Sequence, residues 1–196
     1  MSAKFIVLLT GLLILTFPIF GDEASDYFAQ GVQSGQKRDY FRAVAAFTKA
    51  IELKPDFAEA YNARGLAKGG LAKSPNDTAG ALADYNKAIQ LKPDFAEAFY
   101  NRAIVKQVKG DKVGALADHN KAIELKPDYP KAYCHRGTVK AASRDYSGAM
   151  ADYDKAIELK PDYALPYKSR GLLKQLQGDK EGAEADYKKA KELMSH

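Results

Sequence analysis

The sequence predicts an all-α protein, built as a tandem array of two-helix units that stack into a solenoid. One phrase recurs along the chain: KAIELKPDF at 49–57, KAIQLKPDF at 87–95, and KAIELKPDY at 121–129 and 155–163, at offsets of 38, 34 and 34 residues. A fixed period of about 20–50 residues is typical of repeat architectures, in which neighbouring units cover each other's apolar faces. The period therefore indicates one array rather than a single globular fold.

The first 21 residues stand apart in composition. Residues 5–20 (FIVLLTGLLILTFPIF) carry no charge and follow Lys4. They are shorter than the ~20 residues of a membrane span and closer to the ~7–15 of a signal-peptide core. We interpret residues 1–21 as a signal peptide or signal anchor, and expect the rest of the chain outside the cytoplasm. Gly21 suits a cleavage site, but Ile19 departs from the A-x-A pattern, so anchoring and membrane association through residues 5–20 stay open.

The array itself occupies residues 22–196. In its third unit, Phe99 and Ala103 begin a helical apolar pattern, Gly110 interrupts it, and Pro127 ends the second helix. The five units in register are 24–57, 58–95, 96–129, 130–163 and 164–196, the second with four extra residues.

Small residues recur where two helices of a unit would touch, with aromatic residues beside them. The first helices carry Gly31, Gly65, Ala103, Gly137 and Gly171. At the other end of the array, Lys191 and Glu184 stand where earlier units have Ile157 and Met150. A terminal repeat needs a polar outer face, so we expect the last helix to cap the array.

The repeated pattern resembles the tetratricopeptide repeat, whose period is also 34 residues. Its spacing of aromatic, small and Pro positions is matched in the fourth unit by Tyr133, Gly137, Ala149, Tyr153, Ala156 and Pro161. The resemblance implies a right-handed superhelix whose first helices line a concave groove that binds a peptide or a partner helix. The departures are His119 in place of an aromatic residue, the insert of the second unit, and a last unit without its Pro.

The resemblance also indicates which residues would line that groove: polar, weakly basic first-helix positions that vary between repeats. The predicted partner-binding residues are Asn62, Leu66, Tyr100, Asn101, Lys131, His135 and Lys168, with Cys134, Thr138 and Ser169 on the same face. Asn101 and Lys131 match the family's carboxylate-binding positions, whereas Leu66 and His135 do not. We therefore expect an acidic or extended peptide rather than a dedicated carboxylate clamp.

Two charged positions recur together in units two to five and are absent from unit one. We predict a structural ladder in which each Arg pairs with an Asp, across the helix pair or with the neighbouring unit, because an unpaired, partly buried Arg would be costly. The rival interpretation is a row of arginines that binds anions. The ladder residues are Arg64, Arg102, Arg136 and Arg170 with Asp84, Asp118, Asp152 and Asp186.

Other chemistry has few candidates in the sequence. There is no H-E-x-x-H, C-x-x-C, Walker or G-x-G-x-x-G motif, so we predict no enzyme activity, metal or cofactor. The charge of +5 comes from cations that alternate with acidic residues, which argues against nucleic-acid binding. We expect His119 to pack in the core and Cys134 to be a small, partly buried side chain. Asn76 begins a glycosylation acceptor sequence that matters only in a eukaryotic secretory pathway.

These observations predict a non-catalytic interaction module outside the cytoplasm, periplasmic, secreted or membrane-anchored. It would be a monomer that binds a protein or peptide through its concave face. The alternative is a structural component of the membrane or envelope, held by its basic surface and its N-terminal anchor. Salt would separate the two, because surface attraction fades as ionic strength rises.

Overall fold

The structure is a computed structural model that describes residues 22–72 and 78–195. The predictions for residues 1–21 and for Asn76 lie outside the described residues. Within the described ranges the chain forms ten helices and no strand: α1 (Glu23–Gln36), α2 (Tyr40–Leu53), α3 (Ala58–Leu71), α4 (Ala79–Leu91), α5 (Ala96–Val108), α6 (Lys112–Leu125), α7 (Pro130–Ala142), α8 (Tyr146–Leu159), α9 (Ala164–Leu176) and α10 (Lys180–Met194). None of these helices is both long and apolar enough to cross a membrane.

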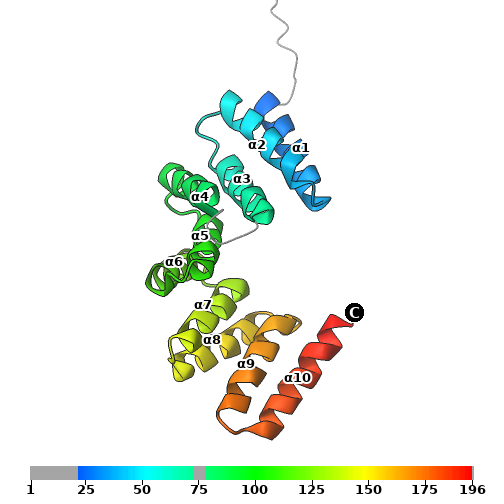
Figure 1. Cartoon of the computed structure of the whole chain (residues 1–196), viewed down its shortest axis with the longest axis vertical. Coiled ribbons are helices and arrows are strands. Elements are labelled where there is room, and N and C mark those ends of the chain that lie inside the picture. Colours follow the sequence, from blue (N-terminus) through cyan, green and yellow to red (C-terminus); the bar gives the residue numbers. More distant parts are fainter. Residues whose placement is uncertain (1–21, 73–77, 196) are drawn as a thin grey trace, which may run out of the picture.

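The helices form antiparallel pairs that stack into an arc (Figure 1). Each odd-numbered helix packs on the even-numbered helix that follows it and also on the next odd-numbered helix, whereas the even-numbered helices do not pack on one another. The odd-numbered helices therefore form the inner row and the even-numbered helices the outer row. This arrangement confirms the predicted all-α solenoid.

The turn between the two helices of a pair has a repeated design. Arg38, Gly110, Arg144 and Gly178 adopt a positive φ between 59° and 88°. An Asp follows each of them and caps the second helix, its side chain accepting a hydrogen bond from a backbone N–H of the first turn. The capping residues are Asp39, Asp111, Asp145 and Asp179.

Close approach within each pair depends on the small residues of the first helices. A Cβ atom added at Gly65 would lie 2.8 Å from the ring of Tyr85, and one at Gly137 would lie 2.8 Å from Tyr153. In the third pair Ala103 replaces this Gly, and the facing residue is His119, whose ring is smaller. The helix pairs thus share one packing scheme: where the residue of the first helix is Ala instead of Gly, the ring of the second helix is the smaller His instead of Tyr.

Candidate partner-binding groove

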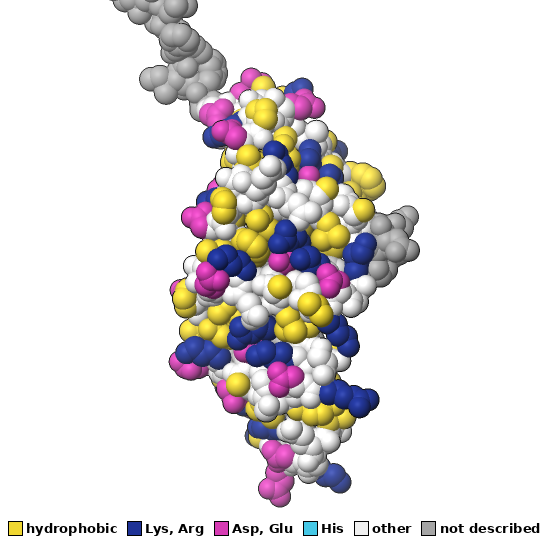
Figure 2. Space-filling view, turned by 90° about the vertical axis from the view of Figure 1, so that its left-hand side faces the viewer, with side chains coloured by type: hydrophobic (Ala, Val, Ile, Leu, Met, Phe, Trp, Pro, Cys, Tyr) yellow, Lys and Arg dark blue, Asp and Glu magenta, His cyan; other side chains and the backbone are white. Residues whose placement is uncertain are grey.

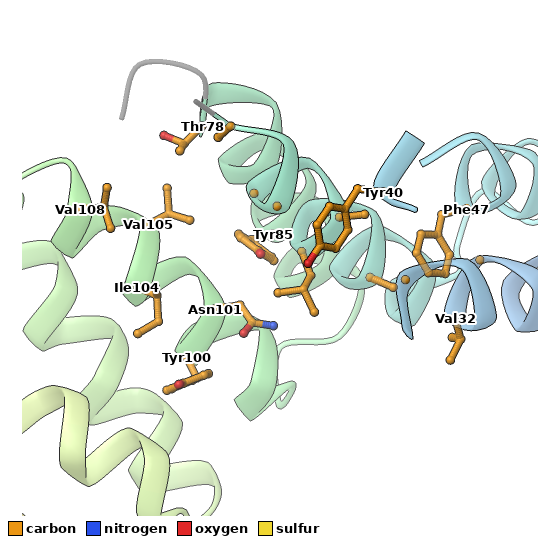
Figure 3. A pocket seen from close by; sticks show the side chains of 18 of the residues that line it. Val32, Tyr40, Phe47, Thr78, Tyr85, Tyr100, Asn101, Ile104, Val105 and Val108 are labelled. Atoms are coloured by element: carbon orange, nitrogen blue, oxygen red, sulfur yellow. The ribbon is translucent and has the colours of Figure 1, made fainter. Parts of the chain in front are cut away.

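A groove of about 880 Å³ lies on the inner row of the described chain. Its walls come from α1, α3 and α5, and its floor includes Phe47 of α2 and Tyr85 of α4 (Figure 3). We call this the N-terminal groove. Its size falls within the range of about 300–1,000 Å³ that is usual for ligand pockets.

The lining of the N-terminal groove is apolar. Val32, Leu66 and Val108 line it while keeping 37%, 59% and 56% of their surface exposed. Such exposure costs free energy, because each large apolar side chain gains about 1.5–3 kcal/mol on full burial. These side chains are therefore available to a partner.

Glycines give the groove its depth on the α3 side. Gly69 and Gly70 both line it, and nothing lies within 4 Å of a Cβ added at Gly69. A Cβ added at Gly70 would instead lie 2.8 Å from the ring of Tyr40. The ring of Tyr40 occupies the space that a side chain at Gly70 would need.

Polar groups enter the groove at few points, and among the described residues that line it none carries a charge. Asn101 donates a hydrogen bond from Nδ2 to Oδ1 of Asn62 at 3.0 Å, which joins α3 to α5. Tyr100 also lines the groove, and burial raises the pKa of its hydroxyl to about 12. The site therefore offers shape and apolar surface rather than acid–base chemistry.

The structure separates the predicted binding residues into two groups. Leu66, Tyr100 and Asn101 line the N-terminal groove, and Asn62 adjoins it through Asn101. The other three, Lys131, His135 and Lys168, do not line it. Lys131 lies instead in a separate hollow of about 220 Å³, and Lys168 is exposed on α9.

His135 lies outside the N-terminal groove and packs between helices. Its ring packs on Tyr100 at 5.7 Å and on His119 at 6.3 Å between centroids. Burial lowers its pKa, and Lys131 lowers it further. Because α5 and α7 touch, this face of α7 is partly covered, and His135 is half-buried.

One expectation differs in emphasis and one is corrected. The described lining of the N-terminal groove is mainly apolar, and the expected cations Lys131 and Lys168 lie outside it. Cys134, expected on the groove face and partly buried, is fully buried beside Ala149 and Tyr153, and this burial raises the pKa of its thiol to about 12. Repeat spacing locates the groove positions of a family, but the helix contacts of this chain decide which of them stay open.

Several groove residues beside Leu66 were not predicted, although the sequence contains a signal for two of them. The repeat position of Leu66 holds Val32 in α1 and Ile104 in α5, which also line the groove, and Thr138 in α7 and Leu172 in α9, which do not. We call Val32, Leu66 and Ile104 the aliphatic column. The column is apolar at a position that is not needed for packing within a pair, which is the pattern of a recurring surface stripe.

The ladder residues lie between the two rows of helices. Arg102 donates from Nε and Nη2 to the two carboxylate oxygens of Asp118 at 2.8 and 2.7 Å, and from Nη1 to Asn86 of the preceding pair at 2.7 Å. Its guanidinium also lies 5.4 Å from the centroid of the Phe99 ring. Each ladder Arg thus bonds to an Asp of its own pair and to a second helix of the preceding pair: Arg64 with Asp84 and Thr48, Arg136 with Asp152 and Asn120, Arg170 with Asp186 and Asp154.

A lysine that the sequence analysis missed completes each ladder unit. Lys106 Nζ lies 2.8 Å from Oδ2 of Asp118, the carboxylate that also binds Arg102. The equivalent lysines are Lys68, Lys140 and Lys174, at 2.8, 2.9 and 3.0 Å from their carboxylates. Each lysine follows its Arg by four residues, one helical turn, and this spacing could have revealed it. We call each Arg–Asp–Lys set a triad.

The outer row carries charges of both signs. Lys49, Lys121 and Lys155 pair with the acidic residue three positions later, at 2.8, 2.6 and 2.6 Å. Figure 2 shows basic and acidic side chains side by side over the face that it displays. This face has no continuous basic stripe of the kind that marks a nucleic-acid surface.

Comparisons with known proteins agree on the repeat. A family model described as TPR repeat, the tetratricopeptide repeat, matches residues 74–110 and 141–178. No curated protein matches the sequence. Among solved structures, the chain is similar to MamA, at 27% identity and a TM-score of 0.69, covering 84% of this chain and 94% of that one.

Two structures of lower sequence identity show the same fold. PilW, titled a type IV pilus biogenesis factor, has a TM-score of 0.79 at 20% identity, covering 90% of this chain and 80% of that one. YrrB, titled a TPR protein with an unusual peptide-binding site, has a TM-score of 0.64 at 21% identity, covering 88% and 87%. The chain therefore carries tetratricopeptide repeats and has the fold of the tetratricopeptide solenoids.

Proposed function

We propose that the protein is a non-catalytic scaffold that acts outside the cytoplasm and binds a segment of a partner protein in its N-terminal groove. The observation that carries this proposal is the groove of about 880 Å³, whose described lining residues are uncharged and include Leu66, more than half exposed. A contiguous, concave apolar surface on a solenoid is a feature of sites that bind protein segments.

The fold supports this proposal in two further ways. Repeat solenoids present extended concave surfaces, and the similar structure of YrrB is titled as having a peptide-binding site. Export rests on residues 1–21 of the sequence alone.

A photo-crosslinking experiment tests the proposal. A photoreactive amino acid is placed at Leu66 and, as a matched control, at Leu172, the equivalent position in α9 with 56% of its surface exposed. We expect a discrete partner band from the native extract at Leu66 but not at Leu172. Equal products at both positions, or none at either, would remove the N-terminal groove as the partner site.

The proposed export is tested separately. The mass of the mature protein and its accessibility to added protease in intact cells report cleavage and compartment. A chain that begins at Met1 and is protected together with cytoplasmic markers would contradict export.

A further inference from the structure

One edge of the N-terminal groove is basic. Lys37 follows Gln36 at the end of α1, and Lys109 follows Val108 at the end of α5; both Gln36 and Val108 line the groove. Lys37, Arg38 and Lys109 are exposed, and none has an ion-pair partner within the described part of the chain. These three cations form what we call the basic edge.

The triads behind the groove also carry an excess of positive charge. Asp84 binds both Arg64 and Lys68, so this set has one more cation than carboxylates. Arg102, Lys106 and Asp118 form the same arrangement beside α5. The excess charge lies in the last turns of α3 and α5, where Lys68 and Lys106 stand.

On the opposite edge of the groove, the acidic residues that begin α3 and α5 are neutralised by ion pairs. At the start of α3, Glu59 binds Lys92 at 2.9 Å, and at the start of α5, Glu97 binds Lys126 at 3.2 Å. The hydrogen bond from Lys92 holds the pKa of Glu59 below its usual value. At the start of α1, Glu23 and Asp26 are exposed. Among the described residues, cations are therefore in excess along one flank of the groove only.

The spacing of the aliphatic column limits the shape of that partner. Neighbouring packed helices lie about 8–10 Å apart, and α1, α3 and α5 each contribute one column residue. An α-helix laid across them advances about 10.5 Å in seven residues and returns to the same face. An extended strand covers this distance in about three residues, which point to opposite faces. In a helix with an apolar residue at every seventh position, the spacing of these residues thus matches the spacing of Val32, Leu66 and Ile104.

A polyproline helix has a comparable repeat of about 9 Å, but it presents a narrow row of side chains. The N-terminal groove is wider than such a row needs, because it spans three first helices and reaches down to Phe47 and Tyr85. The volume of about 880 Å³ suits the apolar face of an amphipathic helix, which inserts several side chains together.

We propose that the occupant of the N-terminal groove is an amphipathic α-helix of a partner protein, with apolar residues at seven-residue intervals and acidic residues along one flank. This inference rests on the proposed function and defines the chemistry of the partner. The acidic flank faces Lys37, Arg38 and Lys109, and the apolar face covers Val32, Leu66 and Val108.

Fluorescence anisotropy with designed peptides tests the inference on the full chain. The probe is a labelled helical peptide with leucines in heptad spacing and glutamates on one flank. One matched peptide has lysines in place of the glutamates, and another has the same apolar and acidic residues but carries prolines at solvent-facing positions. We expect the first peptide to bind and both matched peptides to bind at least about tenfold more weakly.

Variants of the protein locate the binding. We expect Leu66→Asp to lower the affinity for the glutamate peptide at least about tenfold. Leu172→Asp, at the equivalent exposed position of α9, should change this affinity by less than about twofold. Replacing Lys37, Arg38 and Lys109 with Gln should lower the affinity for the same peptide and make that affinity less dependent on salt concentration. The matched control replaces Lys49, Lys121 and Lys155 on the outer row and should leave binding unchanged.

The outcomes distinguish this inference from the proposed function. Equal binding of the proline peptide or the lysine peptide overturns the inference, as does equal loss from Leu66→Asp and Leu172→Asp. If no designed peptide binds while a partner still crosslinks at Leu66, the inference is wrong and the proposed function stands. If the crosslink is absent as well, both are wrong.

Discussion

At the residue scale, the triads place charge in the interior of a small repeat protein. Asp84, Asp118, Asp152 and Asp186 are each 4% exposed, and each lies between an Arg and a Lys. Burial by itself would raise the pKa of Asp186, but the hydrogen bonds from Arg170 and Lys174 outweigh it, and the pKa is lowered. Buried carboxylates of this kind are costly once a partner is removed.

A double-mutant cycle measures this coupling. We expect Arg102→Ala and Asp118→Ala each to lower the free energy of unfolding by about 3 kcal/mol, because each leaves a buried charge without its main partner. The double variant should lose at least about 1 kcal/mol less than the sum, measured by urea denaturation. Lys121→Ala, which breaks an exposed pair with Glu124, serves as control and should cost about 0.3 kcal/mol. Strict additivity would contradict the structural ladder.

His119 and Ala103 form a second residue-scale unit. A Cβ at the equivalent Gly65 would lie 2.8 Å from the facing Tyr ring, so a tyrosine at 119 should collide with Ala103. We expect His119→Tyr to lose about 1–3 kcal/mol of stability through overpacking. Adding Ala103→Gly should recover most of this loss, although glycine alone costs a helix about 1 kcal/mol. If Ala103→Gly worsens the tyrosine variant, the size compensation is wrong.

The same histidine predicts a pH dependence. His119 is fully buried, neither ring nitrogen has a hydrogen-bond partner within the described residues, and burial lowers its pKa to about 3. The unfolded chain binds a proton near pH 6.5, whereas the folded chain does so only near pH 3, so stability is complete above about pH 6.5 and declines as the pH falls below it.

We expect this decline to approach about 1.4 kcal/mol for each pH unit below about pH 6, read from urea midpoints at several pH values. The pKa of His135 is also lowered, so its titration adds to the slope. The Ala103→Gly, His119→Tyr double variant is the control and should show a shallower slope. An unchanged slope would assign the effect to other groups.

At the element scale, the turns before α2, α6, α8 and α10 show that different residues adopt the same backbone conformation. Gly110 and Gly178 adopt the left-handed conformation without a Cβ, whereas Arg38 and Arg144 adopt it at φ values of 59° and 64°. A residue with a side chain loses about 1–2 kcal/mol of stability in this conformation. Glycine avoids this loss, but its greater conformational freedom in the unfolded chain offsets part of the advantage.

A pair of substitutions tests this balance. We expect Arg144→Gly to raise the free energy of unfolding by about 0.5–1 kcal/mol, because the strained Arg144 makes no ion pair among the described residues. Gly110→Ala should lower it by about 1 kcal/mol at the equivalent turn. Thermal unfolding of both variants gives the comparison, and changes of the same sign would contradict the argument.

At the scale of the whole molecule, the solenoid is held together by contacts between neighbouring helix pairs, and the outer face of its last helix has no neighbour within the array. In α10, Glu184 is exposed and Lys191 is exposed, where α8 has the partly buried Met150 and Ile157. Met150 packs against the cluster that includes Leu173 of the next helix pair. A polar outer face on the last helix is what a terminal repeat requires.

A truncation tests the role of this cap. Removing residues 164–196 exposes the apolar face of α8, and we expect the shortened chain to aggregate at concentrations where the full chain is monodisperse. Adding Met150→Glu and Ile157→Lys, which copies the native end, should restore a monodisperse species in size-exclusion chromatography with light scattering. Aggregation that these changes leave untouched would show that the cap lies elsewhere.

The sequence alone determined the features that repeat. The period, the helix pairs, the small residues at the pair contacts and the two ladder positions could be predicted because each helix pair packs mainly on its neighbours, so spacing along the chain reports directly on contact. The insert illustrates this: Arg64 and Asp84 lie 20 residues apart, whereas Arg102 and Asp118 lie 16 apart, and both pairs form.

Only the tertiary structure decided which part of the concave surface forms an unfilled groove. The N-terminal groove arises from the curvature of three first helices and from space left above Gly69, and neither can be read from one position in a repeat. His135, at an expected groove position, lies outside this groove and is half-buried against Tyr100 of α5. Residue spacing predicts contacts between neighbours, whereas a concave site is the volume that no neighbour fills, and that volume depends on how all the units bend together.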